Sequence, residues 1–310
     1  MDSTPKRPRF LVLRGGAIGD FVLTLPALRA LRERWPDAHI ELLGYPHVAN
    51  LALACGLVDH VDSLDRAGMA RFFSLIPSFS EEQIEYIRSF DLIVSFLHDP
   101  GGVVQENLRA AGARQVIYGS PLVERGHAVD HLVKPLETLA LYVSGENPRL
   151  EITATIRKQG AAWLAARGLE TNAVAIHPGS GSPKKNWPVD RFAELARKLA
   201  AGGIAGPFFT WGEADEKTAE TLQLTAGDIP FLTNCTLVEL AAVFANCRAY
   251  VGNDSGITHI AAALGIPVVA LFGPSDPDRW GPRGPNVKIL RAQSRKMKDI
   301  ELSEVLAALM

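Results

Sequence analysis

The chain has 310 residues, too many for one ordinary compact core, and this length fits two α/β domains of about 150 residues each. With 47% hydrophobic and 21% charged residues and a formal net charge of -2, the composition excludes a disordered, fibrous or nucleic-acid-coating chain. We therefore expect no nucleic-acid partner.

Leader, membrane and disulfide signals are also missing from the sequence. The apolar run at residues 10–13 is too short for a signal peptide, and glycine and proline interrupt the most apolar later stretch, residues 260–272. Cys55, Cys235 and Cys247 are widely spaced and form no CxxC pair, so neither a disulfide framework nor a zinc site is indicated. These features predict a cytoplasmic protein with reduced thiols. The oligomeric state does not follow from the sequence, and a monomer is the favoured expectation.

The first half of the chain alternates strands and helices. Residues 10–13 form a predicted strand, followed by a glycine loop and a helix over residues 20–34 with apolar residues at three- and four-residue spacing. Residues 40–43 and 91–96 are further strands, and the capping-box pattern Ser80-x-x-Gln83 predicts a helix start. Such alternation indicates a parallel sheet.

The second half restarts this alternation after a polar stretch at residues 144–149. We place the domains at residues 1–155 and 156–310. Strands are expected at 173–177, 207–211, 249–252 and 268–272, and helices at 190–199, from the box Thr236-x-x-Glu239, at 257–264 and at 302–309. The sequence thus predicts two doubly wound domains.

The loop Arg14-Gly15-Gly16-Ala17-Ile18-Gly19-Asp20 follows the first predicted strand. Its glycines allow close backbone approach, but their spacing is neither GxGxxG nor GxxxxGK, which argues against NAD binding and ATP hydrolysis. Asp20 has two interpretations, a helix N-cap or a carboxylate directed into an interdomain cleft.

The loop from His177 to Pro188 combines Gly and Ser with the pair Lys184-Lys185. Amides, hydroxyls and positive charge together suit a diphosphate, although either lysine alone would more often be a solvated surface charge. Trp187 and Pro188 are expected to anchor the loop and open the next helix.

The loop Gly252-Asn253-Asp254-Ser255-Gly256-Ile257-Thr258-His259 leads directly into a helix. Its N-terminal amides and the Ser255 hydroxyl suit phosphate oxygens, and Asp254 can accept hydrogen bonds from sugar hydroxyls. An Asx turn with an N-cap, and a core histidine at 259, are the structural alternatives.

A DxD pattern, Asp276-Pro277-Asp278, occurs after the last predicted strand. Many glycosyltransferases use DxD for a divalent metal, but no other converging oxygen ligands are evident here. A helix start is the favoured interpretation, and no metal or other cofactor is expected.

Three of these blocks, with the continuation Ala263-Leu264-Gly265-Ile266-Pro267 to Phe272-Gly273-Pro274, are similar to a known family. The chain resembles the ADP-heptose:lipopolysaccharide heptosyltransferases, glycosyltransferase family nine, over essentially its whole length. The resemblance implies the GT-B architecture, two Rossmann-like domains facing across a cleft, with the terminal helix returning toward the N-terminal domain.

The resemblance also implies inverting, metal-independent transfer of a heptose from ADP-heptose to a lipopolysaccharide core or related glycolipid acceptor. A place at the inner face of the bacterial inner membrane is compatible with it. It implies catalytic roles for Asp20 as the base and Lys185 at the donor phosphates, and a ribose contact for Glu216. The full set of predicted substrate-binding residues is Gly16, Gly19, Ser180, Gly181, Lys184, Glu216, Leu237, Asp254, Ser255, Gly256 and His259.

The chain departs from the family pattern at two places: some relatives carry threonines in the loop of Ser180, and many carry larger residues at Gly15-Gly16. Neither departure affects the expected binding of the donor phosphates, and neither identifies the acceptor. Arg66, Arg71 and Arg109 are possible partners for an acidic acceptor. A nucleotide-sugar epimerase of the same architecture and a non-catalytic sugar-nucleotide binding protein remain alternatives. Turnover of donor without acceptor would indicate the epimerase.

Overall fold

The computed structural model describes residues 7–66, 68–169, 172–203, 206–212 and 216–309. Contacts divide the chain into two compact units, Met1–Ala17 with Leu23–Glu146 (unit 1) and Ile18–Val22 with Asn147–Met310 (unit 2). The predicted boundary after residue 155 falls inside helix α7 (Ala154–Ala165), whereas the division by contacts lies between Glu146 and Asn147.

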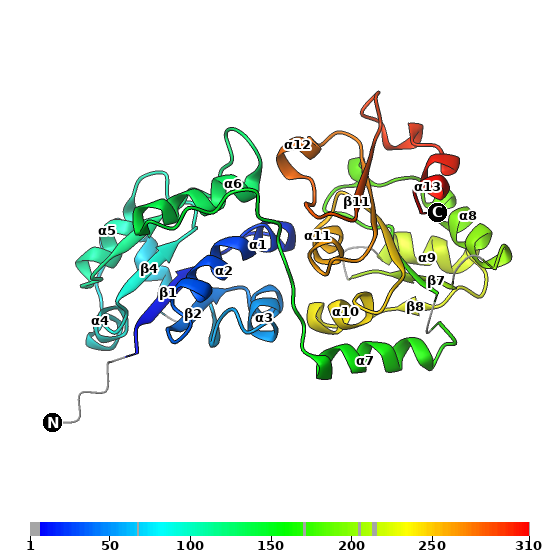
Figure 1. Cartoon of the computed structure of the whole chain (residues 1–310). Helices are drawn as coiled ribbons and strands as arrows, with labels where there is room; N and C mark the ends of the chain where they lie inside the picture. The colour runs from blue at the N-terminus through cyan, green and yellow to red at the C-terminus, as the bar shows by residue number, and fades with distance from the viewer. Residues whose placement is uncertain (1–6, 67, 170–171, 204–205, 213–215, 310) are drawn as a thin grey trace. The chain divides into compact units, whose positions relative to one another are not determined.

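Unit 1 is built on a five-stranded parallel sheet with the order β3-β2-β1-β4-β5 (Figure 1). Its strands are β1 (Arg9–Leu13), β2 (His39–Gly44), β3 (His60–Ser63), β4 (Leu92–Ser95) and β5 (Val116–Tyr118). Its helices are α2 (Leu25–Arg34), α3 (Pro46–Ala54), η1 (Met69–Phe73), α4 (Glu81–Arg88), α5 (Val103–Ala110), α6 (Ala128–Val133) and η2 (Lys134–Leu139). The two innermost strands, β1 and β4, are mostly apolar because both faces of the sheet are covered.

The helix predicted over residues 20–34 is wrong as one element. It is two helices, α1 (Ile18–Val22) and α2, with Thr24 as the N-cap position of α2. Pro26 lies in the first turn of α2, and proline has no backbone N–H to donate to the preceding turn. Its ring also clashes with that turn's carbonyl, so a continuous helix cannot form there.

Unit 2 is built on a six-stranded parallel sheet with the order β11-β10-β9-β6-β7-β8. Its strands are β6 (Ala173–His177), β7 (Gly206–Thr210), β8 (Phe231–Leu232), β9 (Ala249–Asn253), β10 (Val268–Phe272) and β11 (Val287–Arg291). Its helices, with α1 and α7, are η3 (Pro183–Lys185), α8 (Val189–Ala201), α9 (Glu216–Thr225), α10 (Leu237–Phe244), α11 (Gly256–Ala263), α12 (Pro277–Trp280), η5 (Met297–Asp299) and α13 (Leu302–Leu309).

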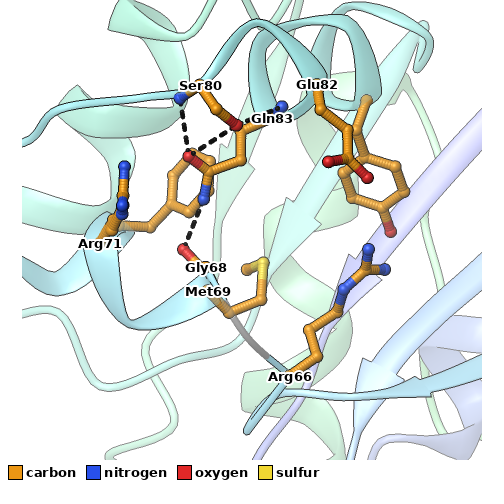
Figure 2. A pocket seen from close by; sticks show the side chains of 9 residues that line it. Arg66, Gly68, Met69, Arg71, Ser80, Glu82 and Gln83 are labelled. Atoms are coloured by element: carbon orange, nitrogen blue, oxygen red, sulfur yellow. Dashed lines mark hydrogen bonds between the residues drawn. The ribbon is translucent and has the colours of Figure 1, made fainter.

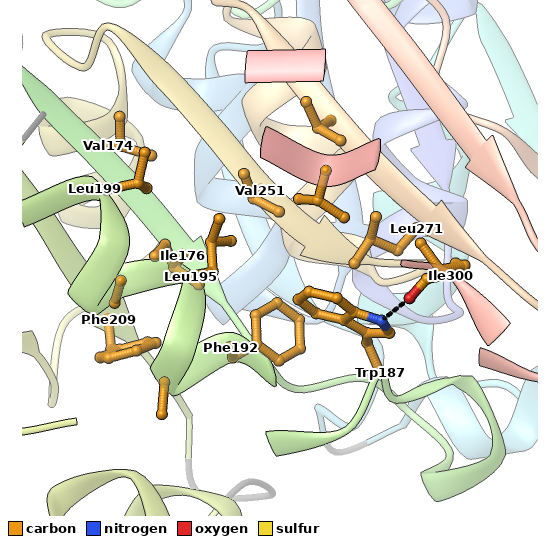
Figure 3. Packing of buried hydrophobic residues seen from close by; sticks show 14 of the residues in the cluster. Val174, Ile176, Trp187, Phe192, Leu195, Leu199, Phe209, Val251, Leu271 and Ile300 are labelled. Carbon is orange, nitrogen blue, oxygen red and sulfur yellow. Dashed lines mark hydrogen bonds between the residues drawn. The ribbon is translucent and has the colours of Figure 1, made fainter. Parts of the chain in front are cut away.

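Alternate residues of the unit 2 strands enter two separate cores. Val174, Ile176 and Leu271 pack on one face with residues of α8, α9 and α13, as Figure 3 shows in part. Ala175 and Ala270 pack on the other face with residues of α7, α10 and α11. This arrangement is the doubly wound fold that the sequence predicted.

The strand order of unit 2 reverses between β6 and β9. The chain runs outward from β6 to β7 and β8, then crosses to β9 and continues outward to β10 and β11. Loops that leave the carboxyl ends of β6 and β9 therefore lie side by side, and such switch points are where open α/β sheets bind ligands.

The terminal helix α13 contacts α8, β10 and β11 of unit 2. The return of this helix toward the N-terminal domain stays a prediction. Across the described residues, no helix combines the length and the apolar character that a membrane span requires.

Candidate functional site

Asn253, the last residue of β9, joins the two loops at the switch point. Its side-chain Oδ1 accepts a hydrogen bond from the Trp187 amide (3.0 Å), and its Nδ2 donates to the Pro178 carbonyl (2.7 Å). Asn253 is fully buried. One side chain thus holds both ends of the loop after β6 against the end of β9.

The ends of β6 and β7 are joined in a similar way. His177 is buried, and its Nδ1 lies 3.1 Å from both the carbonyl and the hydroxyl oxygen of Thr210. The imidazole is thereby fixed in orientation beneath the loops.

Lys185 and Asp254 form an ion pair across these loops, with Nζ and Oδ2 2.7 Å apart. The carboxylate side chain is 8% exposed and the lysine side chain 36% exposed, whereas Lys184 is exposed. A buried carboxylate that lost its cation would be strongly unfavourable, so Asp254 holds the ammonium group in place. The structure therefore distinguishes the two lysines that the sequence placed side by side.

Ser180 braces the loop after β6 from within. Its hydroxyl lies 2.8 Å from the Ser182 carbonyl and 2.6 Å from Asn186 Oδ1, and it accepts a hydrogen bond from the Ser182 amide. Gly181 beside it has open space where a Cβ would lie. The loop is preorganised, with its glycine backbone accessible.

Ser255 is the N-cap of α11, as the structural alternative predicted. Its hydroxyl accepts a hydrogen bond from the Thr258 amide at 3.3 Å. Thr258 is itself buried and hydrogen-bonded to Tyr250 and to the Asn253 carbonyl. The first turn of α11 is therefore held firmly at the end of β9.

Glycines allow α1 to approach the start of α11 closely within unit 2. A Cβ on Gly256 would lie 2.5 Å from Ile18 Cβ and 2.8 Å from the Gly19 nitrogen, and a Cβ on Gly19 would lie 3.3 Å from His259 Cδ2. His259 is buried. Gly256 is therefore needed for packing, whatever it binds, whereas a Cβ on Gly19 would require only a small shift of the His259 ring.

Asp20 lies on α1, which is packed against α11. It is the third residue of that helix and half-buried, so the N-cap interpretation is wrong for it. Gly16, before this helix, has a φ of 95°, a left-handed conformation that favours glycine.

A pocket of about 270 Å³ opens between the two loops in unit 2. It combines polar loop residues with an apolar wall made by Trp211, which follows β7, and by residues of α10 and α11. Its lining residues are Ile18, His177, Ser180, Gly181, Thr210, Trp211, Gly212, Cys235, Leu237, Leu240, Ser255, Gly256 and Ile257. Five residues of the predicted set, Ser180, Gly181, Leu237, Ser255 and Gly256, are therefore brought together at one cavity.

Cys235 lines this pocket. Burial raises the pKa of the Cys235 thiol to about 11, so this lining residue is a neutral thiol near pH 7. Glu216 begins α9, but its side chain lies outside the described residues.

The DxD pattern forms a helix start. Asp276 caps α12 by accepting from the Asp278 amide (3.3 Å), and Arg291 lies 3.7 Å from its carboxylate. Among the described residues, no group of three or more His, Cys, Asp or Glu side chains could hold a metal ion.

Sequence reasoning missed Asn253, His177 and Thr210 as members of the site. Asn253 and His177 lie within motifs that the sequence singled out, but their roles depend on which loops become neighbours. An amide at the end of a buried strand was the only available signal, because it implies a backbone group to satisfy.

The profile of Glycosyltransferase family 9 (heptosyltransferase) matches residues 110–309. Lipopolysaccharide heptosyltransferase 1 of Escherichia coli K12 is 31% identical over 327 residues, covering 97% of this chain and 99% of the relative. The match to lipopolysaccharide heptosyltransferase 2 of Salmonella typhimurium is 36% identical but spans only 37% of that relative's length.

Solved structures show the same fold. A family 9 glycosyl transferase from Veillonella parvula superposes with a TM-score of 0.81 at 22% identity, covering 97% of this chain and 95% of the other. The E. coli heptosyltransferase WaaC with ADP gives a TM-score of 0.73 at 20% identity, covering 96% and 98%. The predicted GT-B fold is confirmed.

Proposed function

The chain belongs to glycosyltransferase family 9 (heptosyltransferase), and from this premise we propose that it transfers a heptose from ADP-heptose to a lipopolysaccharide core or related glycolipid acceptor. One observation carries the proposal: a single pocket is lined by the loop after β6, through Ser180 and Gly181, and by the start of α11, through Ser255 and Gly256. Both predicted phosphate-binding segments thus face one cavity.

The chemistry of this pocket suits an adenosine diphosphate. Trp211, Leu237 and Ile257 supply apolar surface for a purine, while glycine-rich backbone and the first turn of α11 suit phosphate oxygens. Lys185, held by Asp254, supplies a positive charge on the adjacent part of the same loop.

The proposed reaction is a single displacement at the anomeric carbon. Asp20 accepts the proton of an acceptor hydroxyl, whose oxygen forms the new bond to that carbon from the face opposite the diphosphate. The bond from the carbon to the diphosphate oxygen breaks, and ADP leaves with the electron pair. Lys185 and the α11 amides stabilise the charge that develops on it, and the configuration inverts.

Metal independence is part of the proposal. It is supported by the engagement of Asp276 as the α12 cap and by the lysine at the loop after β6, which can take the role of a cation at the diphosphate. Transfer should persist in EDTA.

The test is a transfer assay with ADP-heptose, with and without a lipopolysaccharide-core acceptor, in EDTA, with the product anomer determined by NMR. We expect inverted product only when acceptor is present. Turnover without acceptor would favour an epimerase, and loss in EDTA with recovery by Mg²⁺ would remove metal independence. No consumption of donor under any condition would favour a non-catalytic binding protein.

The role of Asp20 is tested by Asp20→Asn. The change preserves side-chain shape, so melting temperature and ADP affinity should stay near wild type, while transfer should fall about 10²- to 10⁴-fold, the usual contribution of a positioned general base. Asp190→Asn, in the first turn of α8, is a matched control and should transfer normally. A rate for Asp20→Asn within a few-fold of wild type would remove Asp20 from catalysis.

A further inference from the structure

Residues 73–78 of unit 1, here called the tip loop, expose apolar side chains in an unusual concentration. Leu75 is 85% exposed and Ile76 90% exposed, and Phe73 next to them is 48% exposed. Exposed apolar residues scattered singly need no explanation, whereas three within four positions form an exposed apolar patch that calls for one.

The tip loop is held rigidly at its base. Asn107 Nδ2 donates to the Phe72 carbonyl (2.9 Å) and to the Ser74 carbonyl (2.8 Å), and Arg71 donates to the Ser78 carbonyl (2.8 Å). The rings of Phe72 and Phe79, which flank the loop, stack with centroids 4.7 Å apart. Leu75 and Ile76 are therefore exposed because the base of the loop directs the tip outward.

A pocket of about 360 Å³ is lined by residues that precede and follow the tip loop in sequence, among them Arg71 and Ser80 (Figure 2). Gln83 accepts from the Ser80 amide (2.9 Å) and donates to the Gly68 carbonyl (2.8 Å). Arg66 is paired with Asp62 at 2.7 Å. Gln83 thus connects the segments that precede and follow the tip loop, at Gly68 and at Ser80.

The small size of the patch favours a lipid bilayer over a protein as its partner. A stable protein interface buries about 800 Å² on each partner, far more than three side chains of one loop supply. A lipid bilayer needs no complementary shape and accepts a few apolar side chains inserted into its interfacial region. Arg71 beside the tip is exposed and could lie at headgroup level, although Glu81 and Glu82 in the first turn of α4 offset part of its charge.

We propose that the tip loop docks unit 1 on a lipid bilayer by inserting Leu75 and Ile76 between the headgroups. Apolar insertion is the main driving force, and attraction of Arg71 to anionic lipid is a smaller one. The proposal goes beyond heptose transfer, because bilayer binding is measured without donor or acceptor. It also explains how a glycolipid acceptor would come within reach.

The experiment is flotation of the full-length protein with vesicles of phosphatidylcholine, alone or with one-third phosphatidylglycerol. Wild type should float with both and more with the anionic vesicles. Leu75→Ser/Ile76→Ser should lower the partition coefficient onto the vesicles at least about tenfold, because burying each such side chain contributes more than a tenfold factor to it. Leu224→Ser on α9, which alters an equally exposed leucine (87%), should bind as wild type does.

The serine variant should keep the wild-type melting temperature, since both side chains are exposed. Transfer to a soluble acceptor should also be unchanged, which separates failure of this proposal from failure of the transferase assignment. Flotation of the double variant equal to wild type, or no flotation of wild type, would overturn bilayer docking. A wild-type dimer that the double variant abolishes, without vesicle binding, would assign the loop to a second copy instead.

Discussion

Two loops of this protein are each held by an asparagine side chain, but one directs its apolar residues into the core and the other directs them to solvent. Asn253 holds the loop after β6 through the Trp187 amide and the Pro178 carbonyl, and Asn107 holds the tip loop through the Phe72 and Ser74 carbonyls. Each loop thus depends on one amide side chain from another segment of its own unit. Similar anchoring therefore does not decide whether a loop faces the core or the solvent.

The difference lies in what the apolar side chains meet. Trp187 is 1% exposed, donates its Nε1 proton to the Ile300 carbonyl at 2.9 Å and packs edge-on against Phe192 (Figure 3). Leu75 and Ile76 have no comparable burial. The first loop is thus part of a core, which positions a site with little freedom, and the second presents a surface.

The largest expected difference between the loops is in stability. Trp187→Ala should lower the free energy of unfolding by about 3–5 kcal/mol because it empties a packed core position, whereas Leu75→Ala should change it by less than about 0.5 kcal/mol. Denaturant unfolding of both variants measures this. Comparable losses of unfolding free energy in the two variants would show that Leu75 is packed in solution and not exposed.

A smaller difference in stability is expected for the two asparagines that hold these loops. Asn253→Ala should cost about 2–4 kcal/mol, since it leaves the buried Trp187 amide and the Pro178 carbonyl without their partner, and it should also weaken ADP binding. Asn107→Ala should cost less, because its bond to the Ser74 carbonyl is only part-buried. It should leave ADP affinity unchanged, because Asn107 does not line the pocket between the two loops of unit 2. Calorimetric titration with ADP and thermal unfolding give both quantities. Loss of ADP affinity in Asn107→Ala would contradict the prediction that only the asparagine of the loop after β6 affects ADP binding.

The smallest expected effect is on ADP affinity, at the two lysines of the loop after β6. Lys185→Ala should weaken ADP binding by about 1.5–3 kcal/mol, the value of a charge-assisted contact, while Lys184→Ala, at a solvated position, should change it little. Because removal of Lys185 leaves Asp254 unpaired, the variant Lys185→Ala/Asp254→Ala serves as a control for that secondary loss. Equal effects of the two single changes would move the phosphate contact away from Lys185.

Much of the fold could be predicted from local patterns. All the central strands lie where the sequence placed them, and both capping boxes, Ser80 with Gln83 and Thr236 with Glu239, are confirmed. The strands that the sequence did not show are the four sheet edges, β3, β5, β8 and β11. They are short or largely unburied, so they lack the continuous apolar run that marks a strand covered on both faces.

The sequence by itself determined the chemistry of the candidate site: a glycine and serine loop with two lysines, a helix start after a buried strand, and a carboxylate on the first helix. Only the tertiary structure decided which of these groups meet. The strand order places β6 beside β9, so that Asp254 pairs with Lys185 and not with Lys184, and Asn253 bonds to a loop distant in sequence. Local spacing cannot encode such pairings, because neighbours at a sheet edge are set by the long-range order of strands.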